Sequence, residues 1–153
     1  MDKYKGEEAV GPYRYKLWRI WDVTKLKLLF IMHNPSTAND KDDDKTVQRV
    51  IDYAKKWGYG GIYVGNLYAF RSTDPKEMRK SADPVGKDNI QNIKPLISLC
   101  DKVIYAWGFD EKEPKWLRDI VETPYCIDVS KKGNPKHPGR LSKKLNMRQY
   151  ERK

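Results

Sequence analysis

The run KLLFIM at residues 27–32 constrains the fold more than any other part of the chain. Every residue after Lys27 is apolar, and the run stops abruptly at His33-Asn34-Pro35-Ser36. A strand that is apolar on both faces is typical of a parallel sheet covered by helices. Ligands of open α/β sheets bind at the carboxyl ends of such strands, where this polar cluster falls. The cluster therefore indicates a candidate site or, more simply, a turn at Asn34-Pro35.

Strand-like and helix-like segments alternate along the rest of the chain. Further strands are predicted at 13–22, near the edge of the sheet, and at 62–66, 102–106 and 125–129. Helices are predicted at 46–57, capped by the acids at 42–44, at 88–99, interrupted or ended near Pro95, and at 114–121. A long polar surface connection is expected over 67–86. The alternation predicts one α/β domain over 1–153, with three α/β/α layers around a mostly parallel sheet.

Composition narrows the class of protein. Apolar residues make up 39% of the chain and charged residues 34%, and no run of about 18 apolar residues occurs. The Met-Asp-Lys start has no apolar signal-peptide core, so we expect a soluble cytoplasmic protein with no membrane partner. Cys100 and Cys126 lie in apolar settings and are expected to be buried free thiols. No His/Cys cluster has metal-ligand spacing, so we predict no metal and no cofactor.

The net charge of +10 is concentrated near the carboxyl terminus. Residues 131–153 hold nine Lys or Arg and one acid, Glu151, which gives this segment a charge of +8. Such clustering is typical of proteins that bind a phosphate backbone. The segment therefore predicts a nucleic-acid partner, expected to be DNA, although a solvated basic tail would have the same composition.

Polar residues end three of the predicted strands or follow them. They are the cluster from His33 to Ser36, Asn66 after IYVG, and His137-Pro138 beyond the last strand. Taken singly, each is an ordinary turn, cap or surface residue. Parallel strands present their carboxyl ends at one edge of the sheet, so together these residues are predicted to converge there.

These motifs resemble the uracil-DNA glycosylase superfamily over about residues 27–144. MHNP at 32–35 matches the last two residues of a Gly-x-Asn-Pro motif, and IYVGN at 62–66 stands where the base-reading Asn closes a strand. VIYAWG at 103–108 ends in a Trp-Gly pair, and HPGRLS at 137–142 is similar to His-Pro-Ser-Pro-Leu-Ser. Closer still, NPSTA at 34–38, WGYG at 57–60 and DPVG at 83–86 resemble the domain-of-unknown-function 1643 family of bacteria and phages.

The resemblance implies a glycosylase-like fold and hydrolysis of an N-glycosidic bond, with roles for particular residues. Asn34 would hold the attacking water, Asn66 would read the N3–H and O4 edge of a pyrimidine, and His137 would stabilise charge on O2. His33 and Ser36 would also contact the base. Met32 and Gly139-Arg140 depart from the family's motifs, and small residues at 36–38 leave room for a substituted pyrimidine.

The DNA contacts implied by the resemblance and by the charge lie mostly near the carboxyl terminus. Leu141 would be the wedge that fills the gap left by an extruded nucleotide. The phosphate or base contacts would come from Arg140, Lys143, Lys144 and, in the long connection, Arg71. Two alternatives remain open: a nucleobase-binding or DNA-binding protein without hydrolytic activity, and a hydrolase of free nucleosides or nucleotides.

Overall fold

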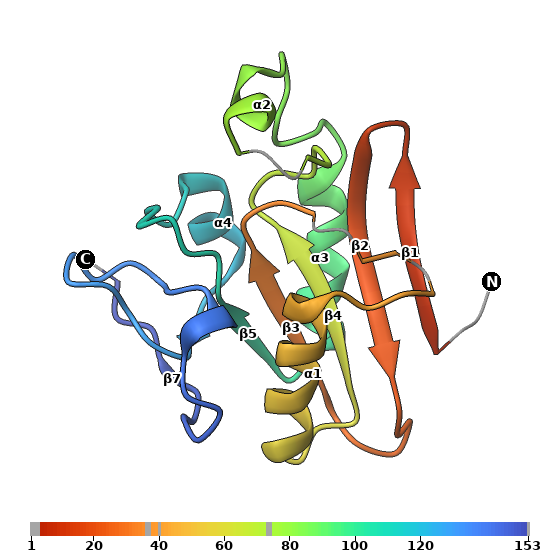
Figure 1. Ribbon diagram of the computed structural model, residues 1–153, viewed down its shortest axis with the longest axis vertical. Helices are drawn as coiled ribbons and strands as arrows, with labels where there is room; N and C mark the ends of the chain where they lie inside the picture. The colour runs from red at the N-terminus through yellow and green to blue at the C-terminus, as the bar shows by residue number, and fades with distance from the viewer. Residues whose placement is uncertain (1–3, 36–37, 40, 73–74, 153) are drawn as a thin grey trace.

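The computed structural model describes residues 4–35, 38–39, 41–72 and 75–152. Its strands form one mixed sheet in the order β1-β2-β4-β3-β5-β6-β7 (Figure 1). The strands are β1 Lys5–Val10, β2 Tyr13–Ile20, β3 Lys27–Met32, β4 Gly61–Asn66, β5 Lys102–Tyr105, β6 Pro124–Cys126 and β7 Arg148–Gln149. The helices are α1 Lys45–Lys56, α2 Pro75–Lys80, α3 Asn89–Leu99, α4 Lys115–Ile120 and the 3-10 helix η1 Pro138–Arg140.

The sheet is mixed, so the prediction of a mostly parallel sheet is wrong. Strands β4, β3, β5 and β6 are parallel, but β2 pairs antiparallel with β4, β1 pairs antiparallel with β2, and β7 pairs antiparallel with β6. The parallel strands come from the part of the chain where strands and helices alternate. The flanks have no helical crossover: a tight turn at Gly11-Pro12, with a φ of 57° at Gly11, joins β1 to β2 as a hairpin.

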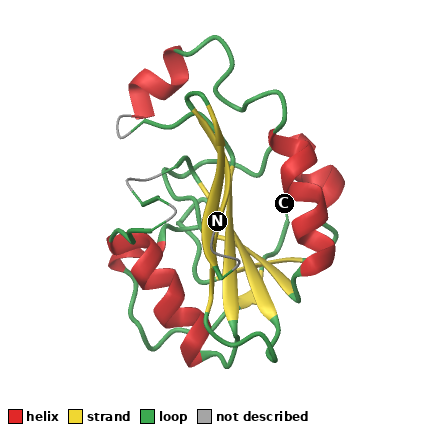
Figure 2. Ribbon diagram, turned by 90° about the vertical axis from the view of Figure 1, so that its right-hand side faces the viewer, coloured by secondary structure: helices red, strands yellow, loops and turns green. Residues whose placement is uncertain are grey.

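Strand β3 lies at the centre of the sheet and is buried on both faces, as its composition predicts. Leu28, Phe30 and Met32 pack into the cluster that contains the apolar face of α1. Leu29 and Ile31 pack into the cluster that contains residues of α3 and α4. Helices therefore cover both faces of the sheet (Figure 2).

The helices begin and end close to their predicted positions. Asp44 caps α1, because its Oδ1 accepts a hydrogen bond from the backbone N–H of Val47 at 2.8 Å. Pro95 lies inside α3 and does not end it. The predicted connection over 67–86 contains the short helix α2. Among the described residues, no helix is both long enough and apolar enough to cross a bilayer.

The basic segment at 131–153 is folded onto the domain over its described part. Tyr150 is buried, and the Arg152 guanidinium binds the carboxylate of Glu113 at 2.9 Å. Side chains of α1 hold the stretch before β7: the Tyr53 hydroxyl donates to the carbonyl oxygen of Ser142 at 2.6 Å. Cys100 and Cys126 are free and buried, as predicted.

Candidate functional site

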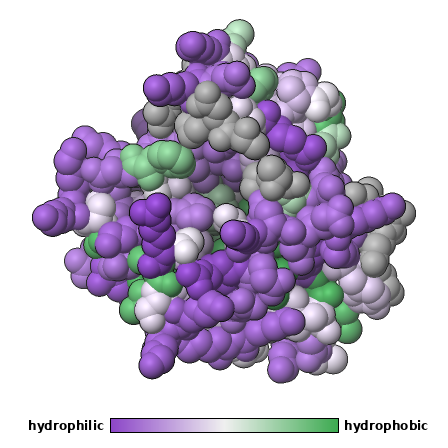
Figure 3. Space-filling model, in the orientation of Figure 1, coloured by the Kyte–Doolittle hydropathy of each residue, from purple (hydrophilic) through white to green (hydrophobic). Residues whose placement is uncertain are grey.

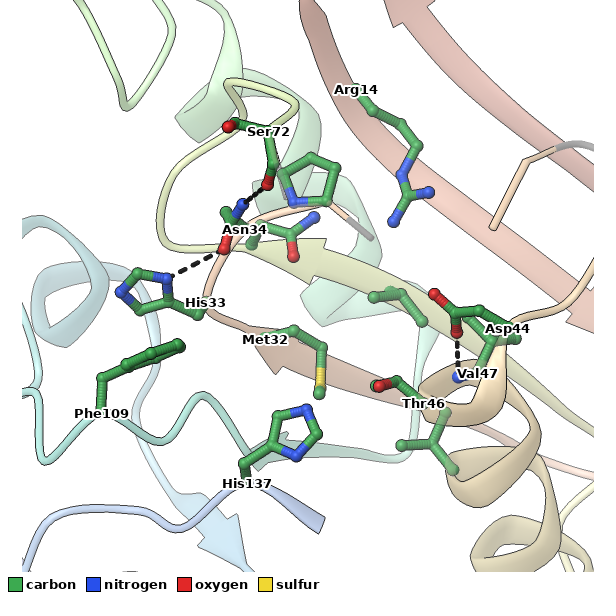
Figure 4. Close-up of a pocket in the computed structure, with 14 residues that line it drawn as sticks. Arg14, Met32, His33, Asn34, Asp44, Thr46, Val47, Ser72, Phe109 and His137 are labelled. Carbon is green, nitrogen blue, oxygen red and sulfur yellow. Dashed lines mark hydrogen bonds between the residues drawn. The ribbon is translucent and has the colours of Figure 1, made fainter. Parts of the chain in front are cut away.

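A cavity of about 260 Å³ lies at the carboxyl ends of β3 and β4. Asn34 follows β3, and His137 reaches the cavity from the loop before η1 (Figure 4). Asn66, which ends β4, also lines the cavity. His33 also lines it. Four predicted site residues from three distant segments of the chain therefore share one space, whereas Ser36 lies outside the described residues.

Asn66 places an unpaired amide in the wall of this cavity. Its side chain is 1% exposed, and neither Nδ2 nor Oδ1 has a hydrogen-bond partner among the residues described. The backbone is fixed, because Asn66 pairs with Met32 of β3 and its carbonyl oxygen accepts from Nδ2 of Asn89 at 2.9 Å. An unpaired buried polar group costs about 1–3 kcal/mol. The amide suits a ligand that offers an acceptor and a donor side by side.

His137 offers a hydrogen-bond donor to the same cavity. Its Nδ1 accepts the backbone N–H of Gly139 at 3.0 Å, so in the neutral ring the proton is on Nε2. Burial lowers the pKa of His137, and the neighbouring Asp44 carboxylate opposes that shift. Gly108 lets the chain approach, because a Cβ there would lie 2.8 Å from the Cβ of His137. The ring is thus a neutral donor in a tightly packed position.

Asn34 is held by a chain of hydrogen bonds. Its Nδ2 donates to the carbonyl oxygen of Ser72 at 2.5 Å, so its Oδ1 faces Nδ1 of His33, at 3.0 Å (Figure 4). Nε2 of His33 lies 3.1 Å from Oε2 of Glu111, and the Tyr68 hydroxyl donates to Oε1 of Glu111 at 2.6 Å. His33 therefore donates through Nδ1, and its Nε2 lies at ion-pair distance from the Glu111 carboxylate. This chain fixes the position of the Asn34 amide.

A strained turn presents Phe109 at the mouth of the cavity. Gly108, Phe109 and Asp110 all have positive φ, at 75°, 56° and 50°. The turn is anchored because Ser130 and Asn134 donate to the Asp110 carboxylate at 2.6 and 2.9 Å. Phe109 is 61% exposed, and its ring centroid lies 4.4 Å from that of His33. Backbone strain of this kind is concentrated at functional sites.

A second hollow, of about 770 Å³, adjoins the cavity and shares Phe109 and His137 with it. Arg140 and Leu141 line this second hollow and not the first. The residue predicted as a wedge therefore lies beside the opening and not inside the cavity. Lys143 and Lys144 are exposed. The face of the molecule shown in Figure 3 is largely hydrophilic.

Several basic side chains are already paired with acids. Arg71 does not line the cavity, and its guanidinium binds Glu7 of β1 at 2.6 Å. In the basic segment, the paired residues are Lys132, Lys136, Arg148 and Arg152. Within this segment, the described basic residues with no acid within 4.0 Å of their charged groups are Lys131, Arg140, Lys143 and Lys144. We refer to Arg140, Lys143 and Lys144 as the basic rim.

Three residues of the site were not predicted from the sequence: Arg14, Phe109 and Glu111. Arg14 reaches the cavity from β2. Lys16, two residues further along the same strand, has the same charge but does not line the cavity, so charge alone could not identify Arg14. Phe109 and Glu111 lie in the loop after β5, where the Trp107-Gly108 pair was the available signal. Trp107 itself is a core residue that donates to the carbonyl oxygen of Glu111 at 2.7 Å. In the part of the chain that the structure describes, no group of three or more His, Cys, Asp or Glu side chains could hold a metal ion.

A protein-family model described as "Protein of unknown function (DUF1643)" matches residues 14–139 of the chain. The matched region includes both strand ends, the Gly108 turn and His137, and it stops before the wedge position at Leu141. No curated protein and no solved structure was found to match.

Proposed function

Since the chain belongs to the DUF1643 family, whose description names no reaction, we propose a function from the chemistry of the site: binding of a nucleobase and hydrolysis of its N-glycosidic bond, as in the uracil-DNA glycosylase superfamily. The expected substrate is a pyrimidine or modified pyrimidine in DNA. The proposal extends to the fold, because helices on both faces of the sheet are compatible with a glycosylase-like three-layer arrangement.

The unpaired amide of Asn66 carries the proposal. An amide offers one donor and one acceptor, which match the O4 and N3–H of a uracil-type ring. The cavity of about 260 Å³ is near the lower end of the usual range for small-molecule pockets, which suits a single base. A ligand that forms hydrogen bonds with both Asn66 atoms removes the free-energy cost of leaving them buried and unpaired. The removal of that cost contributes to the affinity for the ligand.

His137 suits the charge that develops in such a reaction. When water attacks C1′ of the sugar, the electron pair of the C1′–N1 bond moves onto the base, and negative charge appears on its oxygen atoms. The Nε2–H of His137 donates to the O2 of the leaving base in this arrangement. The ring can donate in its neutral form, because Nδ1 needs no proton: it already accepts the backbone N–H of Gly139 at 3.0 Å.

A second candidate function is nucleobase binding without hydrolysis, and the contacts of Asn34 favour it. In the glycosylase role, the Asn34 carbonyl oxygen orients the attacking water. Here Oδ1 already faces Nδ1 of His33 at 3.0 Å, and Nδ2 donates to Ser72. A carbonyl oxygen has a second lone pair, so water can still bind, but it receives only part of the amide's acceptor strength.

Excision assays separate the two functions. The protein is incubated with single-stranded and duplex oligonucleotides that carry uracil, 5-hydroxymethyluracil or 5-formyluracil, and abasic sites are then cleaved with alkali. Strand scission that disappears in Asn66→Ala supports the enzyme. Binding that depends on Asn66 without scission supports the second candidate, and the absence of both with every base would overturn the proposal.

The basic rim favours a polymer as the substrate over a free nucleoside. Neutralising its three residues to Gln should weaken duplex binding for every sequence and lower the salt slope by up to about 0.9 for each phosphate that the protein no longer neutralises. The matched control neutralises Lys132 and Lys136, which lie 3.6 and 3.5 Å from Asp110 and Asp128. A rim variant that binds DNA no differently from this control would argue against DNA as the partner.

A further inference from the structure

Arg14 is the most unusual charged group of the cavity wall. It lies in β2 and is 1% exposed, although arginine is almost never fully buried unless it is paired. Nη1 donates to the carbonyl oxygen of Ala38 at 2.6 Å, but Nε is buried without a hydrogen-bond partner, and no carboxylate of a described residue lies within 4.0 Å of the guanidinium. A buried cation with this few partners is costly in the ligand-free protein.

Arg19, on the same strand, shows how a structural arginine of this protein is satisfied. It is also buried, at 4% exposure, and its Nε binds the Asp43 carboxylate at 2.6 Å. Its remaining nitrogens donate to backbone carbonyl oxygens, including that of Trp18 at 2.8 Å. Among the described residues, Arg14 has one such bond and no carboxylate partner. The two guanidinium groups therefore differ in how many of their hydrogen-bond donors are satisfied. A purely structural role accounts for Arg19 but not for Arg14.

An irregularity in β2 places Arg14 against the cavity. The register between β1 and β2 shifts between Glu8 and Ala9, so that Tyr15 has no paired residue, and Arg14 and Tyr15 are buried in succession. Bulges of this kind redirect side chains beside functional sites. The guanidinium lies in the cavity wall that also holds Asn66 and His137, and Figure 4 shows it directed from β2 toward Asp44.

The donors and acceptors of the wall are unequal. Arg14 supplies only donors, His137 supplies a donor through Nε2, and Asn66 supplies one donor and one acceptor. The Asp44 carboxylate also lines the cavity, but both its oxygens already accept backbone N–H groups, from Val47 and Ala38. A neutral pyrimidine pairs with the amide and the imidazole and adds no acceptor for the guanidinium, whose one described acceptor is the carbonyl oxygen of Ala38. Burial lowers the pKa of Arg14 to about 10, and it stays cationic at neutral pH.

We propose that Arg14 forms an anion subsite, and that the ligand of this cavity is a nucleobase or nucleotide carrying an anionic oxygen group, a carboxylate on the ring or a phosphate on the sugar. The inference rests on the proposed function of the cavity, because Asn66 defines the base. It adds that the guanidinium binds the oxyanion through charge-assisted hydrogen bonds, which replace the partners that Arg14 lacks.

Calorimetry with four ligands tests the proposal: uracil, 5-carboxyuracil, deoxyuridine and deoxyuridine 5′-monophosphate. The wild type should bind one of the two anionic ligands about tenfold or more tightly than its neutral parent, since bonds to a charged group are the strong ones. The pair that shows the gain identifies the carboxylate or the phosphate as the source. Arg14→Met should abolish the gain, and Arg14→Lys should keep only part of it because the planar fork is lost.

Arg118→Met is the matched control, because it makes the same change of charge at an exposed residue of α4 that does not line the cavity. It should keep the preference for the anionic ligand. Circular dichroism and thermal unfolding establish that each variant is folded, and the preference is a ratio within one variant, so a change of stability does not imitate it.

The four-ligand experiment gives different results if the anion subsite is wrong and if the proposed function is wrong. Equal binding of neutral and anionic ligands, dependent on Asn66, would overturn the anion subsite and leave nucleobase binding intact. An anionic preference that survives in Arg14→Met would also overturn it. Absence of binding for all four ligands in the wild type would count against both.

Discussion

Replacement of Asn66 by alanine should stabilise the ligand-free protein, which is unusual for a buried residue. Both polar atoms of the amide are buried without hydrogen-bond partners among the described residues, and each such group costs about 1–3 kcal/mol. Truncation also removes packing, but the amide borders a cavity of about 260 Å³, so the change enlarges existing space and creates no new enclosed void. We expect a net gain of about 1 kcal/mol in the free energy of unfolding, or about 2–4 °C in Tm.

The measurement is denaturant unfolding of the wild type and Asn66→Ala, with Asn134→Ala as the matched control. Asn134 is 2% exposed, and its Nδ2 donates to the carbonyl oxygen and the carboxylate of Asp110, both at 2.9 Å. Its truncation should lower the free energy of unfolding by about 1–3 kcal/mol. If Asn66→Ala loses as much stability as Asn134→Ala, the Asn66 amide is satisfied in solution, and the argument that it awaits a ligand is refuted.

Three further substitutions test the walls of the cavity. A methyl group at Gly108 would lie 2.8 Å from the Cβ of His137 at a φ of 75°, so Gly108→Ala should lower the free energy of unfolding by about 1–3 kcal/mol in denaturant titrations; unchanged stability would contradict this packing. Burial lowers the pKa of His137 from 6.5, so the stability that the neutral ring contributes is present above pH 6.5 and is lost as the unfolded chain takes up a proton below it. The stability difference between the wild type and His137→Gln should therefore fall between pH 7.5 and pH 5, and a constant difference would argue against a half-buried ring that stays neutral. Asn34→Asp would place an oxygen where Nδ2 now donates to the Ser72 carbonyl, so it should lower the free energy of unfolding at pH 7 by about 1–3 kcal/mol. The lost stability should return in acid, when the protonated carboxyl can donate. A stability loss that does not depend on pH would contradict the hydrogen bond.

The centre of the fold could be predicted from local pattern because its physical causes are local. Strand β3 is apolar on both faces, and Asp44 precedes a helical run of apolar residues. The flanking strands have no such pattern: β1 is largely exposed and β7 has two exposed residues, so pairing with a neighbour defines them more than composition does. Pro95 did not end α3 because it is exposed together with Gln91, whose carbonyl oxygen can bond to water.

The residues of the site also differ in whether a local sequence pattern predicts them. Asn34 and Asn66 follow parallel strands, so topology alone brings them to one edge of the sheet. Arg14 arrives through a shift of register in an antiparallel pair, and Phe109 through a strained turn whose anchor, Asp110, binds Ser130 and Asn134. Neither cause has a signature within a few residues of sequence. Sequence pattern could therefore indicate the amides but not the guanidinium or the aromatic ring beside them.

The polar groups that line this cavity suit the binding of a ligand better than the hydrolysis of a bond. In the proposed function, the Nε2–H of His137 and the Arg14 guanidinium would both stabilise negative charge, whether a bound anion carries it or a departing base develops it. Hydrolysis also needs an acceptor for the proton of the attacking water, and the Asn34 amide cannot take one. Among the described residues that line the cavity, Asp44 is the only carboxylate, and both its oxygens accept backbone N–H groups, from Val47 at 2.8 Å and Ala38 at 3.3 Å. Because both Asp44 oxygens are already engaged, we expect the site to favour recognition over hydrolysis, and any excision should be slow compared with binding.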